Sequence, residues 1–135
     1  MKVHIQQLNN MVIESTNIPS TAIVVMDASI KNNITTSILH THLHNKPITK
    51  TLHHIVHVTS SEAKLSAIRC GINQATSHED ISKIIVITDS IHIAKIIFNT
   101  LSHLYQVYTA AILSNLHNFF LCHQSNSIEF WEYSS

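Results

Sequence analysis

The pattern of apolar and polar residues predicts two strands that are buried on both faces. Ala22 to Met26 is an unbroken apolar run, and Ile84 to Ile87 is a second one. Neither run alternates with polar residues, which is typical of central strands in a mixed α/β sheet. The first run leads directly into Asp27, and the second leads through one threonine into Asp89. Because a buried carboxylate needs a positive or hydrogen-bonding partner, the pattern predicts one shared site at these two strand ends.

Alternation and turn residues predict the remaining strands. Residues 34–44 place alternate side chains on two faces, after a turn at Asn32-Asn33. Asn45-Lys46-Pro47 is predicted to be the next turn, and Ile48 to Val58 a third strand that lies at a sheet edge. The first three strands therefore form an antiparallel meander. A last short strand is predicted over Ser127 to Tyr133.

Apolar residues at helical spacing predict three helices between these strands. The predicted ranges are Ser60 to Thr76, Ser90 to Leu104, and Tyr105 to Cys122. The apolar stripes consist of Leu65, Ile68, Ile72 and Ala75 in the first helix, Ile93, Ile97 and Leu101 in the second, and Ile112, Leu116 and Phe119 in the third. Residues 1–20 are predicted to be a leading helix or tether that Pro19 closes, and residues 21–135 to be one domain.

Composition and charge narrow the class of protein. The 135 residues are 44% hydrophobic and 12% charged, which favours a folded chain over a disordered one. No apolar run is long enough for a membrane helix, and the first ten residues lack the apolar core of a signal peptide, so an intracellular protein, cytoplasmic or nuclear, is expected. The formal net charge is zero, so any binding of a polyanion must depend on local contacts. The single glycine, Gly71, excludes a glycine-rich phosphate loop.

Three short motifs lie, in order along the chain, on a predicted strand, a predicted helix and a second predicted strand. They are Met26-Asp27-Ala28-Ser29 on the first strand, residues 60–68 (SSEAKLSAI) at the start of the first helix, and Thr88-Asp89-Ser90 at the end of the fourth strand. In this order they resemble the ribonuclease H domains that follow reverse transcriptase in retroelements. The resemblance implies an α/β fold with a five-stranded mixed sheet flanked by helices. Strands 1–3 would be antiparallel, and strands 1, 4 and 5 parallel.

The resemblance also implies a reaction and a set of site residues. It implies hydrolysis of the RNA strand of an RNA/DNA hybrid with two Mg²⁺ ions, or with Mn²⁺, held by carboxylates. Asp27 would bridge the two ions, while Glu62 and Asp89 would each hold one of them. The implied partners are the hybrid itself and a reverse transcriptase domain or a second copy of the chain.

Several features favour other interpretations. Asp89 could start a helix with Ser90, and Glu62 could form a capping box with Thr59. Ala28 replaces the glycine that is usual in the family, and no final helix with a fourth carboxylate is expected before Ser135. The predicted helix that ends at Cys122 contains no lysine or arginine. The alternative to a nuclease is therefore a related module that has weak or no activity and serves in binding or as a scaffold.

The twelve histidines are the compositional outlier. His40, His42 and His44 alternate onto one face of the second strand, and the third strand carries His53, His54 and His57. They could gather around Zn²⁺ or Ni²⁺, but their spacing matches no compact metal motif, and a surface that contacts solvent, nucleic acid or protein is the favoured interpretation. If the third strand mediates a homodimer through the sheet edge, protonation of these histidines below about pH 6.5 should weaken it.

Overall fold

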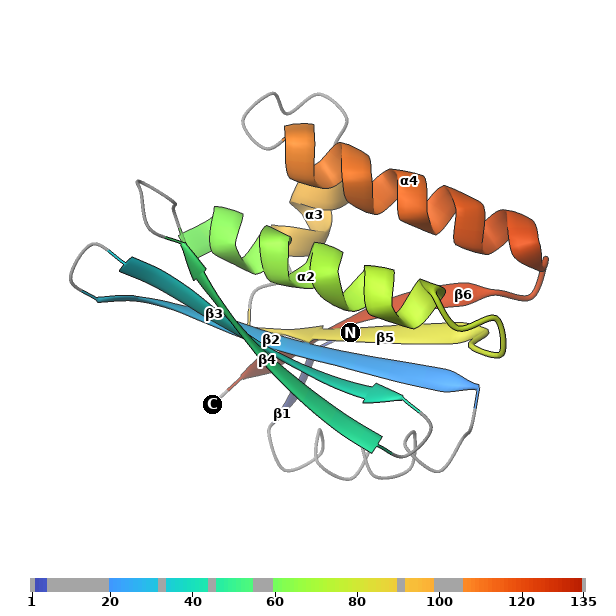
Figure 1. Cartoon of the computed structure of the whole chain (residues 1–135), viewed down its shortest axis with the longest axis horizontal. Coiled ribbons are helices and arrows are strands. Elements are labelled where there is room, and N and C mark those ends of the chain that lie inside the picture. Colours follow the sequence, from blue (N-terminus) through green and yellow to red (C-terminus); the bar gives the residue numbers. More distant parts are fainter. Residues whose placement is uncertain are drawn as a thin grey trace.

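The described part of the chain forms one mixed sheet with helices packed on it. In the computed structural model, the backbone is described for residues 2–4, 20–31, 34–43, 46–54, 60–89, 92–98 and 106–134. Side chains are described for residues 20–25, 61–89, 92–97 and 109–133. Within these ranges the sheet has six strands in the order β1-β6-β5-β2-β3-β4 (Figure 1).

The strands pair in two groups that share β2. Their bounds are Lys2–His4 (β1), Thr21–Lys31 (β2), Ile34–Leu43 (β3), Lys46–His54 (β4), Lys83–Thr88 (β5) and Ser127–Ser134 (β6). β2, β3 and β4 form an antiparallel meander. β2 pairs in parallel with β5, β5 with β6, and β6 with β1. The central position of β2 and β5 agrees with their unbroken apolar runs.

The sheet differs from the sequence prediction at its β1 edge. Five strands were expected, and β1 adds a sixth by pairing Lys2 with Glu132 and His4 with Ser134. The prediction of a leading helix or tether is therefore wrong for Lys2–His4, because the backbone groups of β6 would otherwise form an open edge that a further strand can pair with. Residues 5–19, including the apolar positions that predicted the helix, lie outside the described residues.

The opposite edge of the sheet is β4, as the sequence predicted. The prediction of a turn at residues 45–47 is wrong for Lys46 and Pro47, because β4 begins at Lys46 and includes Pro47. Proline lacks a backbone N–H, and an edge strand tolerates it because one side of the strand has no partner. The predicted end of this strand, residues 55–58, lies outside the described residues.

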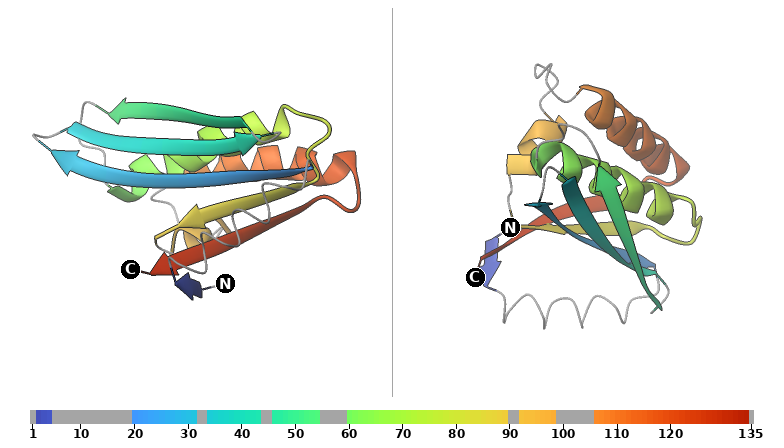
Figure 2. Two further views of the ribbon diagram at one scale, coloured as in Figure 1. Left: turned by 90° about the horizontal axis from the view of Figure 1, so that it is seen from below. Right: turned by 60° about the vertical axis from the view of Figure 1, so that its left-hand side comes forward.

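Three described helices lie on the same side of the sheet (Figures 1 and 2). They are Ser60–Thr76 (α2), His92–Phe98 (α3) and Gln106–Cys122 (α4). The bounds of α2 match the prediction, and α4 begins one residue later than predicted. Of the helix predicted over residues 90–104, only His92–Phe98 lies within the described part. None of the described helices is long and apolar enough to cross a membrane.

The core occupies both faces of the central strands. On the helix side, alternate residues of β2 and β5 pack against α2, α3 and α4. This cluster includes Ala22, Val24, Leu65, Ile68, Ile72, Ile84, Val86, Ile97, Ile112 and Leu116. On the other face, Ile23, Ile85, Ile87 and Trp131 form a second buried cluster. Burial on both faces fixes the register of β2 against β5, since a slip of one residue would exchange the two faces.

Candidate active site

The carboxyl end of β5 lies beside the middle of β2 in the sheet. These strands are parallel neighbours, and their last recorded pair is Val25 with Ile87. Asp27 follows two residues after Val25, and Asp89 two residues after Ile87. Extended by two residues, this register places Asp27 beside Asp89 on adjacent strands, whose spacing is about 4.8 Å. The prediction that Asp27 ends its strand is wrong, because β2 continues to Lys31 and Asp27 pairs with Ile38 of β3. Asp89 does follow the end of β5. The Asp27 side chain lies outside the described residues, so the structure places this residue by its backbone alone.

Asp89 has a specific partner, Lys64 on α2. The Lys64 Nζ donates a hydrogen bond to the Asp89 Oδ1 over 2.9 Å. The Lys64 side chain is only 14% exposed, whereas that of Asp89 is 37% exposed. On either side of Lys64, Ala63 and Leu65 are fully buried. The contact thus connects a helix that is anchored in the core with the end of a central strand.

Glu62 lies in the first turn of α2 and is partly buried. A negative charge at this position is favourable, because the first turn carries unpaired N–H groups and the positive end of the helix dipole. The contact from Lys64 brings this end of α2 close to the end of β5. Residues two apart on a helix point to different sides, however, so the contact locates the helix end and not the Glu62 carboxylate. The grouping of all three acids remains a prediction, and the alternative capping residues, Thr59 and Ser90, lie outside the described residues.

The predicted ligands suit a divalent cation in their chemistry. Carboxylate oxygens are hard donors of the kind that Mg²⁺ prefers. The ammonium of Lys64 is already a cation at hydrogen-bond distance from Asp89, which shows that a positive charge can be accommodated there. Among the side chains that the structure describes, no three His, Cys, Asp or Glu residues are grouped so that they could hold a metal ion. That finding does not include Asp27, whose side chain is not among them.

Four histidines of the alternative metal site lie on two neighbouring strands. His40 and His42 lie on β3, and His53 and His54 on β4, so the structure confirms that they belong to neighbouring strands. Their side chains, and the whole of His44 and His57, lie outside the described residues. A metal site on this part of the sheet stays a prediction.

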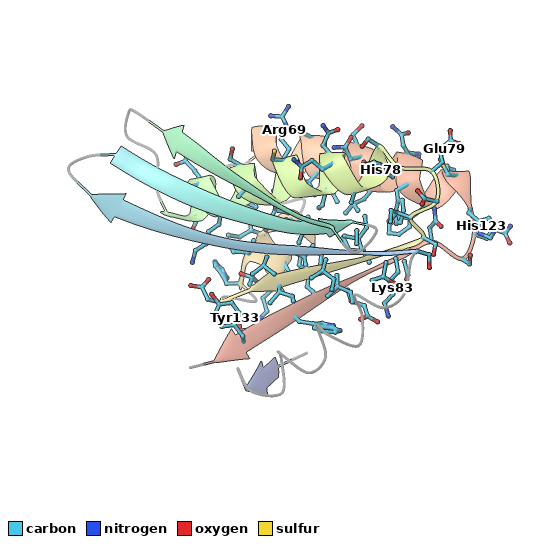
Figure 3. All side chains as sticks on the ribbon, turned by 60° about the horizontal axis from the view of Figure 1, so that its bottom comes forward. Arg69, His78, Glu79, Lys83, His123 and Tyr133 are labelled. Atoms are coloured by element: carbon cyan, nitrogen blue, oxygen red, sulfur yellow. The ribbon has the colours of Figure 1, made fainter. Side chains whose placement is uncertain are left out.

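A cavity of about 710 Å³ lies at the opposite end of the molecule. It is bounded by the C-terminal ends of α2 and α4 and by the loops that follow them. Its lining is rich in side-chain amides and histidines: Asn73, Asn115, Asn118, Asn126, His78 and His123. Figure 3 shows His78, Glu79 and His123 at this end, near Lys83, while Tyr133 lies toward the far end of β6. The cavity is thus remote from the carboxyl ends of the strands.

Sequence reasoning did not single out Lys64 or this cavity. A signal for Lys64 was present, because a lysine flanked by Ala63 and Leu65 on an apolar helix is a candidate for a buried ion pair. The cavity depends on the position of the loops at residues 77–82 and 123–126 next to each other. A hydrogen bond of 2.9 Å from the N–H of Ser127, just after the second loop, to the Ser82 carbonyl connects them. That juxtaposition follows only from the parallel pairing of β5 with β6.

Comparison with known proteins relates the fold to solved structures. No protein-family model and no curated protein sequence matches the chain. The N-terminal RNase H domain of Rv2228c from Mycobacterium tuberculosis is similar with a TM-score of 0.62 and 12% identity, over 85% of this chain and 88% of that one.

Two further similar structures contain nucleic acid. LC11-RNase H1, which was isolated from compost by a metagenomic approach, aligns in its complex with an RNA/DNA hybrid with a TM-score of 0.52 and 9% identity, over 84% of each chain. The foamy viral protease-reverse transcriptase in complex with RNA/DNA hybrid aligns with a TM-score of 0.54 and 12% identity. That alignment includes 89% of this chain and 18% of the viral one. At these identities the likeness concerns the fold.

Proposed function

We propose that this chain, which has the ribonuclease H-like fold, is a metal-dependent endoribonuclease that hydrolyses the RNA strand of RNA/DNA hybrids. The observation that supports the proposal is the parallel register of β2 and β5, which puts Asp27, within β2, beside Asp89, just past the end of β5. The first turn of α2, with Glu62, lies close to this end because Lys64 contacts Asp89. Ligands of open α/β sheets collect at the carboxyl ends of strands, and three acids there suit phosphate-ester hydrolysis with metal ions.

The proposed roles of the three acids are those that the resemblance to ribonuclease H domains implies. Asp27, on the central strand, would bridge two Mg²⁺ or Mn²⁺ ions, and Glu62 and Asp89 would each hold one side. When bound, such ions supply charge stabilisation for the attacking water and the leaving 3′ oxygen. The protein's own contribution is to fix the carboxylates on rigid elements. Val24 and Val86, which lie opposite each other three residues before Asp27 and Asp89, are fully buried, and the neighbouring helix residues Ala63 and Leu65 are fully buried as well.

The proposed substrate is a hybrid, and its binding is expected to depend on local contacts. The chain has no net charge, and α4 contains no lysine or arginine. The hybrid-bound structures of similar fold support this substrate class. Contacts to 2′-hydroxyl groups would select the RNA strand. As protein partners we propose a reverse transcriptase domain, by analogy with the viral protein, or a second copy of the chain paired through the edge strand β4.

A second candidate function is binding of the hybrid without catalysis. The observation that favours it is the contact of the Lys64 ammonium with Asp89, since this carboxylate is then not free to bind a metal ion. Ala28, at the position where the family usually has glycine, points the same way. The two candidates differ in one measurable property, which is cleavage.

Cleavage of a labelled RNA/DNA hybrid tests the proposal directly. The parent chain is expected to cut the RNA strand with Mg²⁺ or Mn²⁺ and to leave duplex DNA of the same sequence intact. Asp27→Asn removes the proposed bridging charge and is expected to abolish cleavage while retaining the fold. Hybrid binding without cleavage by the parent chain would support the second candidate. Equal cleavage of both duplexes would overturn the ribonuclease H proposal.

Thermal unfolding tests the metal site without reference to activity. An ion that binds only the folded state stabilises it by RT ln(1 + [ion]/Kd), which is about 1.4 kcal/mol at ten times Kd. Millimolar Mg²⁺ or Mn²⁺ is therefore expected to raise the Tm of the parent chain and to leave that of Asp27→Asn nearly unchanged. An equal response of both proteins would exclude a metal site at Asp27.

A further inference from the structure

We propose that the Lys64 ammonium is a built-in competitor for the divalent cation at Asp89, so that a metal ion binds there only when it displaces the lysine. The inference rests on the proposed metal site and adds a control on its affinity. Lys64 is then a positioning residue: it holds Asp89 in place before the ion arrives. It also sets the ion concentration at which the site fills.

The geometry of the contact supports competition. The 2.9 Å distance from Nζ to Oδ1 is that of a charge-assisted hydrogen bond. A carboxylate oxygen that accepts this bond has fewer lone pairs available for a metal ion. An ammonium group this close to Asp89 also repels a divalent cation, and the repulsion is screened less where the groups are partly buried. Both effects lower the affinity of the Asp89 carboxylate for a divalent cation.

The position of Lys64 on the helix makes this contact persistent. Its side chain is only 14% exposed, and its neighbours Ala63 and Leu65 are fully buried. α2 cannot move away from the end of β5 without exposing this part of the core. The aliphatic stem of lysine is flexible, however, and can move its charged head while the helix stays fixed. Displacement of the ammonium therefore requires only a change of side-chain rotamers.

A second lysine–carboxylate pair provides a matched control. Lys83, the first residue of β5, contacts Glu129 Oε1 over 3.4 Å, and these side chains are 38% and 45% exposed. Lys83 lies five residues before Thr88, so the two ends of β5 are about 17 Å apart. That exceeds the screening length of about 8 Å at physiological salt. Removal of the Lys83 charge should therefore not be felt at Asp89.

The test measures Mn²⁺ binding by titration calorimetry, with electron paramagnetic resonance of free Mn²⁺ as a second readout. Lys64→Met is expected to bind Mn²⁺ about fivefold more tightly than the parent chain. Lys64→Arg, which keeps the charge, is expected to retain the parental affinity or to weaken it. Lys83→Met is expected to match the parent. Circular dichroism verifies the fold of each variant, and Lys64→Gln replaces Lys64→Met if the latter does not fold.

The outcomes separate this inference from the proposed function. Unchanged or weaker Mn²⁺ binding by Lys64→Met, in a parent chain that does bind Mn²⁺, would overturn the competition and leave the metal site standing. Equal tightening by Lys64→Met and Lys83→Met would also overturn it, because the cause would then be net charge. If the parent binds Mn²⁺ no better than Asp27→Asn does, both the inference and the proposed metal site are wrong.

Discussion

The two ends of strand β5 each carry a lysine–carboxylate pair, but the pairs differ in distance, burial and surroundings. At the carboxyl end, Lys64 contacts Asp89 over 2.9 Å, with a lysine that is mostly buried on α2. At the amino end, Lys83 contacts Glu129 over 3.4 Å between two half-exposed side chains on adjacent strands. Of these two described pairs, the first lies beside a further aspartate, Asp27, on the adjacent strand β2. The same chemical pair is therefore structural at one end and part of a candidate reaction site at the other.

The cavity and the candidate site at Asp89 lie at opposite ends of strand β5. The cavity of about 710 Å³ is at the amino end of β5 and is lined mainly by amides, histidines and small polar residues. Among the described residues that line it, Glu79 is the one acid and none is a lysine or arginine. A hydrolytic site for a large, extended substrate does not need an enclosed cavity, since a hybrid lies across a surface. Cavity size alone would thus point to the end opposite the proposed site.

The largest expected difference between the two ends of β5 concerns the rate of hybrid cleavage after one carboxylate at each end is neutralised. Asp89→Asn removes a proposed metal ligand and is expected to lower the rate of hybrid cleavage roughly 1,000-fold, which corresponds to about 4 kcal/mol of transition-state stabilisation. Glu129→Gln breaks the amino-end pair and is expected to change the rate less than about twofold. Single-turnover rates with saturating Mg²⁺ measure both. Similar losses in the two variants would remove the functional distinction between the ends.

Core truncations are expected to show that both ends are equally well packed. Ile84, near the amino end of β5, and Ile87, near its carboxyl end, are both fully buried, on opposite faces of the sheet. Ile84→Ala and Ile87→Ala should each lower the free energy of unfolding by about 3 kcal/mol. Denaturant titration of both variants gives these values. A loss at Ile87 of less than about 1 kcal/mol would indicate a loosely packed carboxyl end, which could not hold ligands rigidly.

Much of this fold was predictable because its hydrophobic patterns are unambiguous. The bounds of α2 match the prediction, β5 contains the predicted apolar run Ile84 to Ile87, and the stripe residues Leu65, Ile68 and Ile72 are fully buried. The sequence predicts a turn at Pro47, whereas β4 begins at Lys46, because an edge strand can contain proline. β1 was missed because three residues carry no periodic signal. Its place depends on pairing with a strand more than 120 residues away in the chain.

The candidate site was predicted in its parts but not in its contacts. The apolar runs that lead into Asp27 and Asp89 predicted neighbouring strands, and the β2–β5 pairing agrees with that. The predicted strand end is found only at Asp89, because β2 continues past Asp27 to Lys31. The partner of Asp89 was not foreseen, because Lys64 is 25 residues away and meets it only through the packing of α2 on the sheet. Sequence periodicity predicts the face on which a residue lies. It does not predict which charged side chains from two elements come within hydrogen-bond distance.

A smaller effect, on the free energy of unfolding, is expected from Asn126, whose side chain binds the last turn of α4 near the amino end of β5. The Asn126 Nδ2 donates to the Phe119 carbonyl over 2.8 Å, and that carbonyl is in the last turn of α4, where no helical N–H remains to pair with it. Asn126→Ala should lower the free energy of unfolding by about 1 kcal/mol. Asn118→Ala, an exposed residue that lines the same cavity, is the control and should change it by less than about 0.5 kcal/mol. Hybrid cleavage should be unchanged in both, since neither residue lies near Asp89.

The smallest effect concerns the two ion pairs in the absence of metal, and double-mutant cycles isolate it. For Lys64→Met with Asp89→Asn the expected coupling is about 0.5 to 1 kcal/mol, because the contact is short and the lysine is partly shielded from solvent. For Lys83→Met with Glu129→Gln it should be below about 0.3 kcal/mol, because both side chains are well hydrated.

Raising the salt from 0.1 to 1 M shortens the screening length from about 10 to 3 Å. The amino-end coupling should then vanish while much of the carboxyl-end coupling remains. If the two couplings were equal and equally sensitive to salt, Lys64 would be an ordinary surface lysine, and the difference between the two ends would rest on the position of Asp27 alone.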